Sequence, residues 1–167
     1  SNFDAGKASI IENISAGEPA GIESEETTHF YVVDAVGSAV SITTTINGSY
    51  GNKVVHGGGG FLLNNEMDDF SAKPGVPNMF GLIGAEANAI EPGKRMLSSM
   101  TPTILEKEGA LFMVVGTPGG SSIITSVFQV ILNILEFNMT MQAAVSAARF
   151  HHQWKPDAIQ ASGDALT

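Results

Sequence analysis

The fold class follows from the stretch ALFMVVGTPGGSSIITSVFQVILNILEF, residues 110–137. Residues 110–115 are apolar and rich in β-forming side chains, which predicts a strand. From Ser121 to about Phe137 apolar side chains recur at helical spacing, which predicts an amphipathic helix. Gly119 and Gly120 lie between them and predict a tight turn. The stretch therefore predicts a strand that passes directly into a helix.

The apolar residues of this helix are expected to form its packed face. They are Ile124, Val127, Phe128, Ile131, Leu132 and Leu135. Thr140 is a candidate N-cap of a second helix through Ala148, because its hydroxyl can accept from a free amide of the first turn.

Two pairs of β-rich segments predict antiparallel hairpins. Residues 30–33 and 39–46 are joined by a turn around Gly37, and residues 103–105 are joined to 110–115 by a short acidic turn. Hairpins followed by helices indicate an α+β fold with helices layered on one face.

The remaining segments predict irregular structure. Residues 1–26 are small, polar and acidic and read as a flexible leader. Residues 47–60 are rich in glycine and asparagine and predict a loop, and residues 73–78 predict a rigid, proline-punctuated surface loop.

Composition narrows the possible functions. The 167 residues fit one domain, and a net charge of −9 argues against nucleic acid and anionic membrane surfaces as partners. Charged residues make up 15%, below the roughly 25% typical of soluble domains, which fits either a Gly- and Ala-rich enzyme core or a face covered by another polypeptide. The chain has no cysteine, so disulfides, thiolate zinc sites and a cysteine nucleophile are excluded. No apolar run reaches transmembrane length.

An acidic segment between apolar residues predicts a cation-binding pocket wall. It is LLNNEMDDF, residues 62–70, with carboxylates at Glu66, Asp68 and Asp69. Carboxylates in such surroundings suit a substrate ammonium or a metal ion. The spacing matches no EF-hand loop, so the metal is the weaker alternative.

Thr27 lies where the acidic leader meets the first strand. It is either an ordinary β-former or, if the Glu26–Thr27 bond is cut, a nucleophile with its own base. The freed α-amine would have a pKa of about 7.7–8.0, which suits a base near neutral pH.

Two further features suit acyl-transfer chemistry. The Gly119 and Gly120 amides at a helix start can form an oxyanion hole, or the glycines serve only a tight turn. Ser98 and Ser99 lie among apolar residues and either donate to a ligand carboxylate or satisfy local backbone groups.

Two other motifs are weaker. Residues 56–59, His-Gly-Gly-Gly, resemble the oxyanion motif of lipases and esterases, but the chain has no G-x-S-x-G nucleophile elbow. His151 and His152 could ligate a metal, but adjacent histidines rarely face one ion, and Phe150 and Trp154 beside them favour packing.

The order of these motifs resembles the small-subunit region of the γ-glutamyltranspeptidases, which are N-terminal-nucleophile hydrolases. The resemblance is carried by residues 27–29, 62–71, 97–100, 119–121 and 149–154. It implies an αββα sandwich, of which this chain supplies part, with no cofactor and no metal. Met96 and Ser122 depart from many relatives, which have proline and arginine there.

The resemblance also implies roles for the candidate residues. Thr27 is the nucleophile released by self-cleavage after Glu26, and Thr45 supports its hydroxyl. The amides of Gly119 and Gly120 form the oxyanion hole.

The substrate-binding roles follow from the same resemblance. Asn47, Glu66 and Asp69 hold the α-amino end of the γ-glutamyl group, and Ser98 and Ser99 hold its α-carboxylate. Residues 74–85 correspond to a lid loop over the pocket.

The implied organisation is a two-subunit precursor. Residues 1–26 end the large-subunit region, and residues 27–167 form a C-terminally truncated small-subunit region, so the chain as given is an uncleaved, inactive fragment. The expected partners are the large subunit, glutathione or another γ-glutamyl donor, and an amino-acid or peptide acceptor, in a periplasmic or extracellular location. The large subunit supplies an arginine clamp that neither Arg95 nor Arg149 matches.

The implied activity is transfer or hydrolysis of γ-glutamyl groups through an acyl-enzyme on Thr27. The alternatives are a non-catalytic relative that binds γ-glutamyl compounds or amino acids, or an acylase of the same superfamily acting on poly-γ-glutamate or a β-lactam side chain.

Overall fold

The computed structural model describes residues 27–162. The leader, Glu26 and the expected domain boundary lie outside the described residues, so the structure bears only on the Thr27 side of the expected cleavage site.

Two antiparallel hairpins form the centre of the structure. Strand β1 (Thr27–Val33) pairs with β2 (Ala39–Thr45), and β5 (Thr103–Lys107) pairs with β6 (Ala110–Val115), as the sequence predicts. Strand β2 contacts both β5 and β6, so the two hairpins lie face to face.

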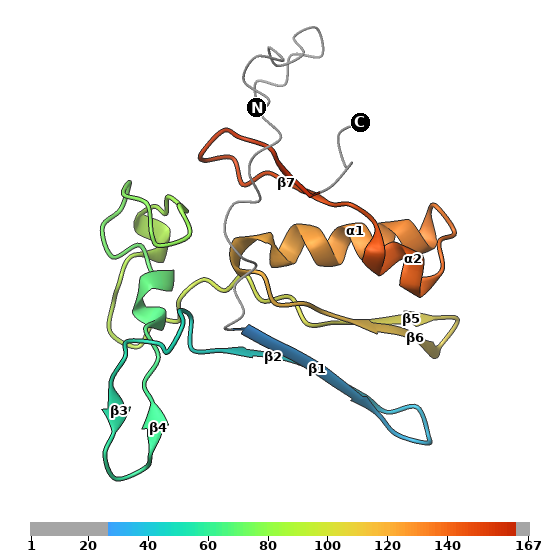
Figure 1. Cartoon of the computed structure of the whole chain (residues 1–167), viewed down its shortest axis with the longest axis horizontal. Helices are drawn as coiled ribbons and strands as arrows, with labels where there is room; N and C mark the ends of the chain where they lie inside the picture. The colour runs from blue at the N-terminus through green and yellow to red at the C-terminus, as the bar shows by residue number, and fades with distance from the viewer. Residues whose placement is uncertain (1–26, 163–167) are drawn as a thin grey trace, which may run out of the picture.

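The helices complete a layered arrangement. Helix α1 (Ile123–Leu135) lies over the β5–β6 hairpin, and β1–β2 lies on the opposite side of that hairpin (Figure 1). Helix α2 (Met141–Ser146) packs against α1, and its N-cap Thr140 accepts a hydrogen bond from the Ala143 amide. The order helix, sheet, sheet is three of the four layers of an αββα sandwich, which confirms the predicted fold class.

The buried face of α1 differs from the prediction. Ile123, Val127 and Val130 are buried, whereas Ile124 and Phe128 are 50% and 60% exposed. The helix is apolar around most of its circumference, so the spacing alone did not identify which stripe packs on the sheet. Of the six predicted core residues, only Val127 is buried.

The glycine-rich segment before the acids is not a plain loop. It contains a short hairpin, β3 (Val55–His56) with β4 (Phe61–Leu62), whose turn is the four-glycine run. The His56 and Phe61 rings stack with centroids 5.1 Å apart, which links the two strands. The hairpin projects away from the layered part of the molecule (Figure 1).

A second short hairpin near the end of the described residues was also not predicted. It joins β7 (Phe150–His151) to β8 (Gln160–Ala161). The expectation that Phe150 and Trp154 pack is wrong for both, because their side chains are 50% and 70% exposed. The buried residue of the segment is His151.

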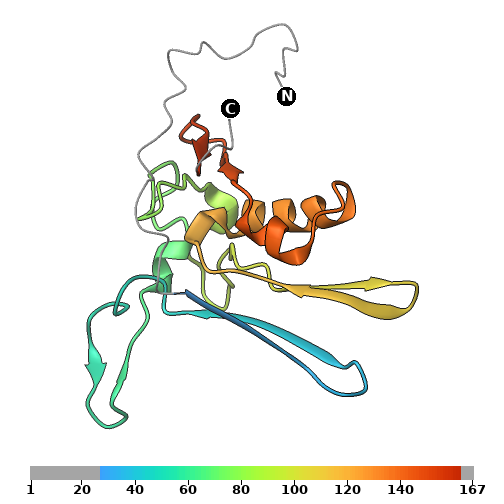
Figure 2. The same cartoon turned by 45° about the vertical axis from the view of Figure 1, so that its right-hand side comes forward.

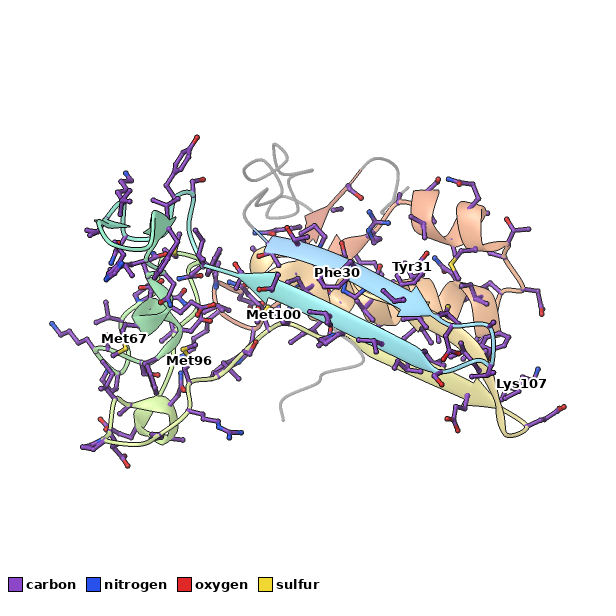
Figure 3. The ribbon with its side chains drawn as sticks, turned by 90° about the horizontal axis from the view of Figure 1, so that it is seen from below. Phe30, Tyr31, Met67, Met96, Met100 and Lys107 are labelled. Atoms are coloured by element: carbon purple, nitrogen blue, oxygen red, sulfur yellow. The ribbon has the colours of Figure 1, made fainter. Side chains whose placement is uncertain are left out.

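One face of the β1–β2 hairpin is apolar and exposed. Phe30 is opposite Ile42 and Val32 is opposite Val40, and all four side chains are more than a third exposed. Figure 3 views this face from below, with Phe30 labelled, and no helix of the described residues lies against it. We call these four residues the free sheet face. It agrees with the expectation that another polypeptide covers one face of the chain.

Both long hairpins start at the same end of the molecule. Figure 2 shows the beginning of β1, the end of β6 and the beginning of α1 meeting there. The ring of His29 lies directly against Gly116, at a place where a Cβ would overlap it. Among the described residues, no helix is both long and apolar enough to span a bilayer.

Candidate active site

Thr27 and Thr45 are held side by side by the register of the first hairpin. They are opposite one another, and the Thr27 hydroxyl donates to Thr45 Oγ1 over 3.1 Å. Thr45 Oγ1 also accepts from the Asn47 amide over 3.0 Å. Thr27 is 8% exposed, so its hydroxyl is held in a largely buried position. The structure thus brings together three of the predicted site residues.

Asn47 joins the end of β2 to the acidic segment. It is 4% exposed, and its side-chain amide donates to the Asn65 carbonyl over 3.3 Å. The Asn65 side chain in turn accepts from the Gly48 amide over 2.8 Å. The sequence analysis assigned no role to Asn65, although the two amide side chains in the acidic segment could have suggested one. Its hydrogen bonds connect the end of β2 to the acidic segment.

The acidic segment forms a short 3-10 helix, Glu66–Asp69. Burial, together with the neighbouring carboxylates of Glu66 and Asp68, raises the pKa of Asp69 to about 6. Burial also raises the pKa of Glu66. Asp68 is engaged, because its carboxylate accepts from the Met79 amide over 3.0 Å.

The Asp69 carboxylate has no hydrogen-bond partner within residues 27–162, whereas its backbone carbonyl accepts from the Asn88 side chain. A half-buried carboxylate among like charges favours a cation that would neutralise it. In the part of the chain that the structure describes, no three His, Asp or Glu side chains are grouped to hold a metal ion.

A cavity of about 290 Å³ lies beside the acids. Asp69 and Ser99 both line it, and residues 73–84, which we call the cavity loop, form much of its wall. Asn78 holds this loop in shape, because its side-chain oxygen accepts from the Phe80 and Leu82 amides. The predicted loop at residues 73–78 is irregular, as expected, and forms the first part of this longer segment. Thr27 is not among the residues that line this cavity.

The two serines have different partners. Ser99 donates its hydroxyl proton to the Gly120 carbonyl over 3.0 Å. Ser98 is exposed and accepts from the Met100 amide, so its proton remains available to an acceptor. Ser99 therefore ties the cavity to the diglycine turn, and Ser98 is the freer donor of the pair.

The diglycine turn requires glycine at both positions. Gly119 and Gly120 have φ angles of 137° and 55°, which residues other than glycine rarely adopt. A Cβ on Gly120 would also lie 3.0 Å from the Phe80 ring. Within residues 27–162 no loop or side-chain acceptor takes either amide. These amides are available for a developing negative charge.

The histidines of the two weaker motifs make contacts with neighbouring side chains. His56 stacks on Phe61 in the β3–β4 turn. His151 bonds Thr125 and Gln153, whereas His152 bonds Asp157, so the two rings take different partners.

Comparisons with known proteins point to one family. The family model described as Gamma-glutamyltranspeptidase matches residues 4–165. Glutathione hydrolase proenzymes of Escherichia coli (strain K12) and Pseudomonas aeruginosa are 51% and 60% identical, over 95% and 81% of this chain. These matches span only 27% and 24% of the two relatives, so the chain covers about a quarter of their length.

Solved structures give the same result. A crystal structure of a mutant Helicobacter pylori gamma-glutamyltranspeptidase superposes with a TM-score of 0.81 at 57% identity, covering 84% of this chain and 75% of that one. The Bacillus anthracis transpeptidase CapD is more distant, with a TM-score of 0.56 at 26% identity, over 76% and 61% of the two chains.

The layered fold is that of the N-terminal-nucleophile hydrolases, with a buried threonine at the start of its first described strand. Within that class, the chain belongs to the gamma-glutamyltranspeptidase family.

Proposed function

We propose that this chain is the small-subunit region of an enzyme that hydrolyses or transfers γ-glutamyl groups from glutathione and related amides. The observation that carries the proposal is the hydrogen-bonded connection from Thr27 through Thr45 and Asn47 to the acidic segment. It joins a buried hydroxyl to Asn65, at the start of the segment that carries the unneutralised Asp69 carboxylate. The names of the relatives, glutathione hydrolase proenzymes, support the substrate class.

The proposed chemistry begins with cleavage of the Glu26–Thr27 bond. The new α-amine of Thr27 takes the proton of its own hydroxyl as Oγ1 attacks the γ-carbonyl carbon of the donor. The Gly119 and Gly120 amides stabilise the oxyanion. Collapse expels the amine of the leaving group, which takes the proton, and leaves a γ-glutamyl ester on Thr27. Water or an acceptor amine then attacks the ester and regenerates the hydroxyl.

Recognition of the donor rests on opposite charges. The carboxylates of Asp69 and Glu66 attract its α-ammonium group, and Asn47 is proposed to assist them. Ser98 offers a proton to the α-carboxylate, and Ser99 reaches it only by giving up its bond to Gly120. The pKa shifts of the two acids support this role, because a bound ammonium would stabilise their charged forms.

The proposed partner is the large subunit of the same precursor. The relatives are proenzymes, and the free sheet face offers four exposed apolar side chains for a covering layer. A periplasmic or extracellular location and an amino-acid or peptide acceptor are part of the same proposal.

Mass spectrometry of the full-length precursor tests the proposal. We expect cleavage before Thr27 in the unmodified protein, none in Thr27→Ala, and normal cleavage in the control Thr28→Ala, whose side chain is exposed. Intact precursor that still binds γ-glutamyl compounds would instead identify a non-catalytic binder. Release rates from a γ-glutamyl anilide, poly-γ-glutamate and a β-lactam side chain would distinguish the acylase alternatives.

A further inference from the structure

Gln153 lies where three segments of the chain meet. Its side-chain oxygen accepts from Ser121 Oγ over 2.8 Å and from His151 Nε2 over 3.0 Å. Its side-chain nitrogen donates to the Phe80 carbonyl over 3.4 Å and to the Lys155 carbonyl over 3.2 Å. Ser121 follows the diglycine turn, and Phe80 lies in the cavity loop. The Gln153 side chain therefore connects the cavity loop with the diglycine turn, the two segments next to the proposed reaction.

The orientation of this amide is fixed by its partners. The carbonyls of Phe80 and Lys155 can only accept, so they must face the NH₂ group, and the oxygen must face Ser121 and His151. His151 is buried, and its other ring nitrogen bonds the Thr125 hydroxyl over 2.8 Å. Because Thr125 belongs to α1, the network is anchored to the rigid helix layer.

The two structures also touch directly. The Phe80 ring lies against Gly120, so a shift of the cavity loop would change what covers the proposed oxyanion amide. The same loop walls the cavity that contains Asp69 and Ser99. A contact that fixes Phe80 thus acts on the shape of the binding cavity, and a contact that fixes Ser121 acts on the diglycine turn.

We propose that Gln153 is a positioning residue that holds the cavity loop and the diglycine turn in one arrangement, so that the wall of the donor cavity and the oxyanion amides keep a fixed relative position. The inference rests on the proposed function. It assigns the two halves of the Gln153 amide different effects: the nitrogen fixes the loop and acts on donor binding, whereas the oxygen fixes the turn and acts on the chemical step.

Isosteric variants in the full-length, processed protein separate these effects. Gln153→Glu keeps acceptors for Ser121 and His151 but loses the donor to the Phe80 and Lys155 carbonyls, so we expect KM for a γ-glutamyl anilide to rise roughly tenfold with kcat changed less than about threefold. Ser121→Ala removes one contact to the turn, so we expect kcat to fall roughly tenfold with KM nearly unchanged. Gln142→Ala, on the exposed side of α2, is the control and should match the unmodified protein.

Hydrogen exchange of the same proteins gives a readout that does not need turnover. In Gln153→Glu the amides of residues 76–84 should exchange faster than in the unmodified protein, while those of the β5–β6 turn should not change. Unchanged exchange in the cavity loop would overturn the inference. So would the same changes of kcat and KM in Gln153→Glu and Ser121→Ala, accompanied by a lower Tm. If the unmodified protein and Gln142→Ala show no γ-glutamyl turnover, the proposed function fails, and the exchange result still decides whether Gln153 positions the loop.

Discussion

Donor binding should weaken at acidic pH because of Asp69. The pKa of this carboxyl is raised to about 6 by burial first and then by Glu66 and Asp68. A group with this pKa is nearly fully ionised at about pH 7.5 and about one-tenth ionised at about pH 5. Because the ammonium of the donor needs the ionised form, affinity should fall about tenfold between these two pH values.

Competition by free L-glutamate measures this binding apart from the chemistry. L-Glutamate carries the same α-ammonium and α-carboxylate groups as the donor, and its inhibition constant does not include the titration of the Thr27 amine in the chemical step. We expect the constant to rise about tenfold from about pH 7.5 to about pH 5. In Asp69→Asn it should be weak at every pH and show no such rise.

The cause of the shift can be tested with one neighbour. Glu66→Gln removes a repelling carboxylate, so the pKa of Asp69 should fall and the loss of affinity should move to lower pH. Glu86→Gln is the matched control, because Glu86 is exposed and contributes nothing to the shift at Asp69. An inhibition constant that is flat between about pH 7.5 and about pH 5 would refute the reasoning.

The same carboxyl should cost folding stability at neutral pH. Its pKa in the folded protein is raised above the ordinary 3.8, so folding favours the protonated form, and stability falls as pH rises from about 4 through about 6. For a half-exposed group, solvent screening reduces this cost to on the order of 1 kcal/mol. Asp69→Asn should therefore unfold at a higher temperature than the unmodified protein at about pH 7.5 and show little difference at about pH 4.

Two further substitutions test the packing of the site. Thr45→Val removes the acceptor of the Thr27 hydroxyl, so the rate of precursor cleavage and kcat should both fall roughly tenfold, while thermal stability changes little. Full activity in this variant would exclude a supporting role for Thr45. Gly116→Ala places a methyl group on the His29 ring and should lower the free energy of unfolding by about 1–3 kcal/mol. The control is Gly57→Ala, whose methyl group meets no atom within 4 Å, so this variant should unfold as the unmodified protein does. Equal melting temperatures for the two variants would contradict this packing.

Local sequence patterns predicted the structural elements that are determined by residues close together in the chain. The turn at Gly37, the Thr140 cap and the strand-to-helix passage at Gly119 each depend on neighbouring residues, and the structure confirms all three. The β3–β4 and β7–β8 hairpins were missed because two-residue strands are too short to show alternation.

The sequence by itself determined the α+β class, the acidic segment and the order of motifs that places the chain in its family, because these depend on residue types and spacing. Tertiary structure alone decided which stripe of α1 is buried, that the Asp69 carboxylate has no partner among residues 27–162, and that Ser99 and Gln153 both bond the segment around Gly120. Those properties depend on residues up to 73 positions apart in the chain, as between Gln153 and Phe80, and only the folded backbone brings such residues within hydrogen-bonding distance.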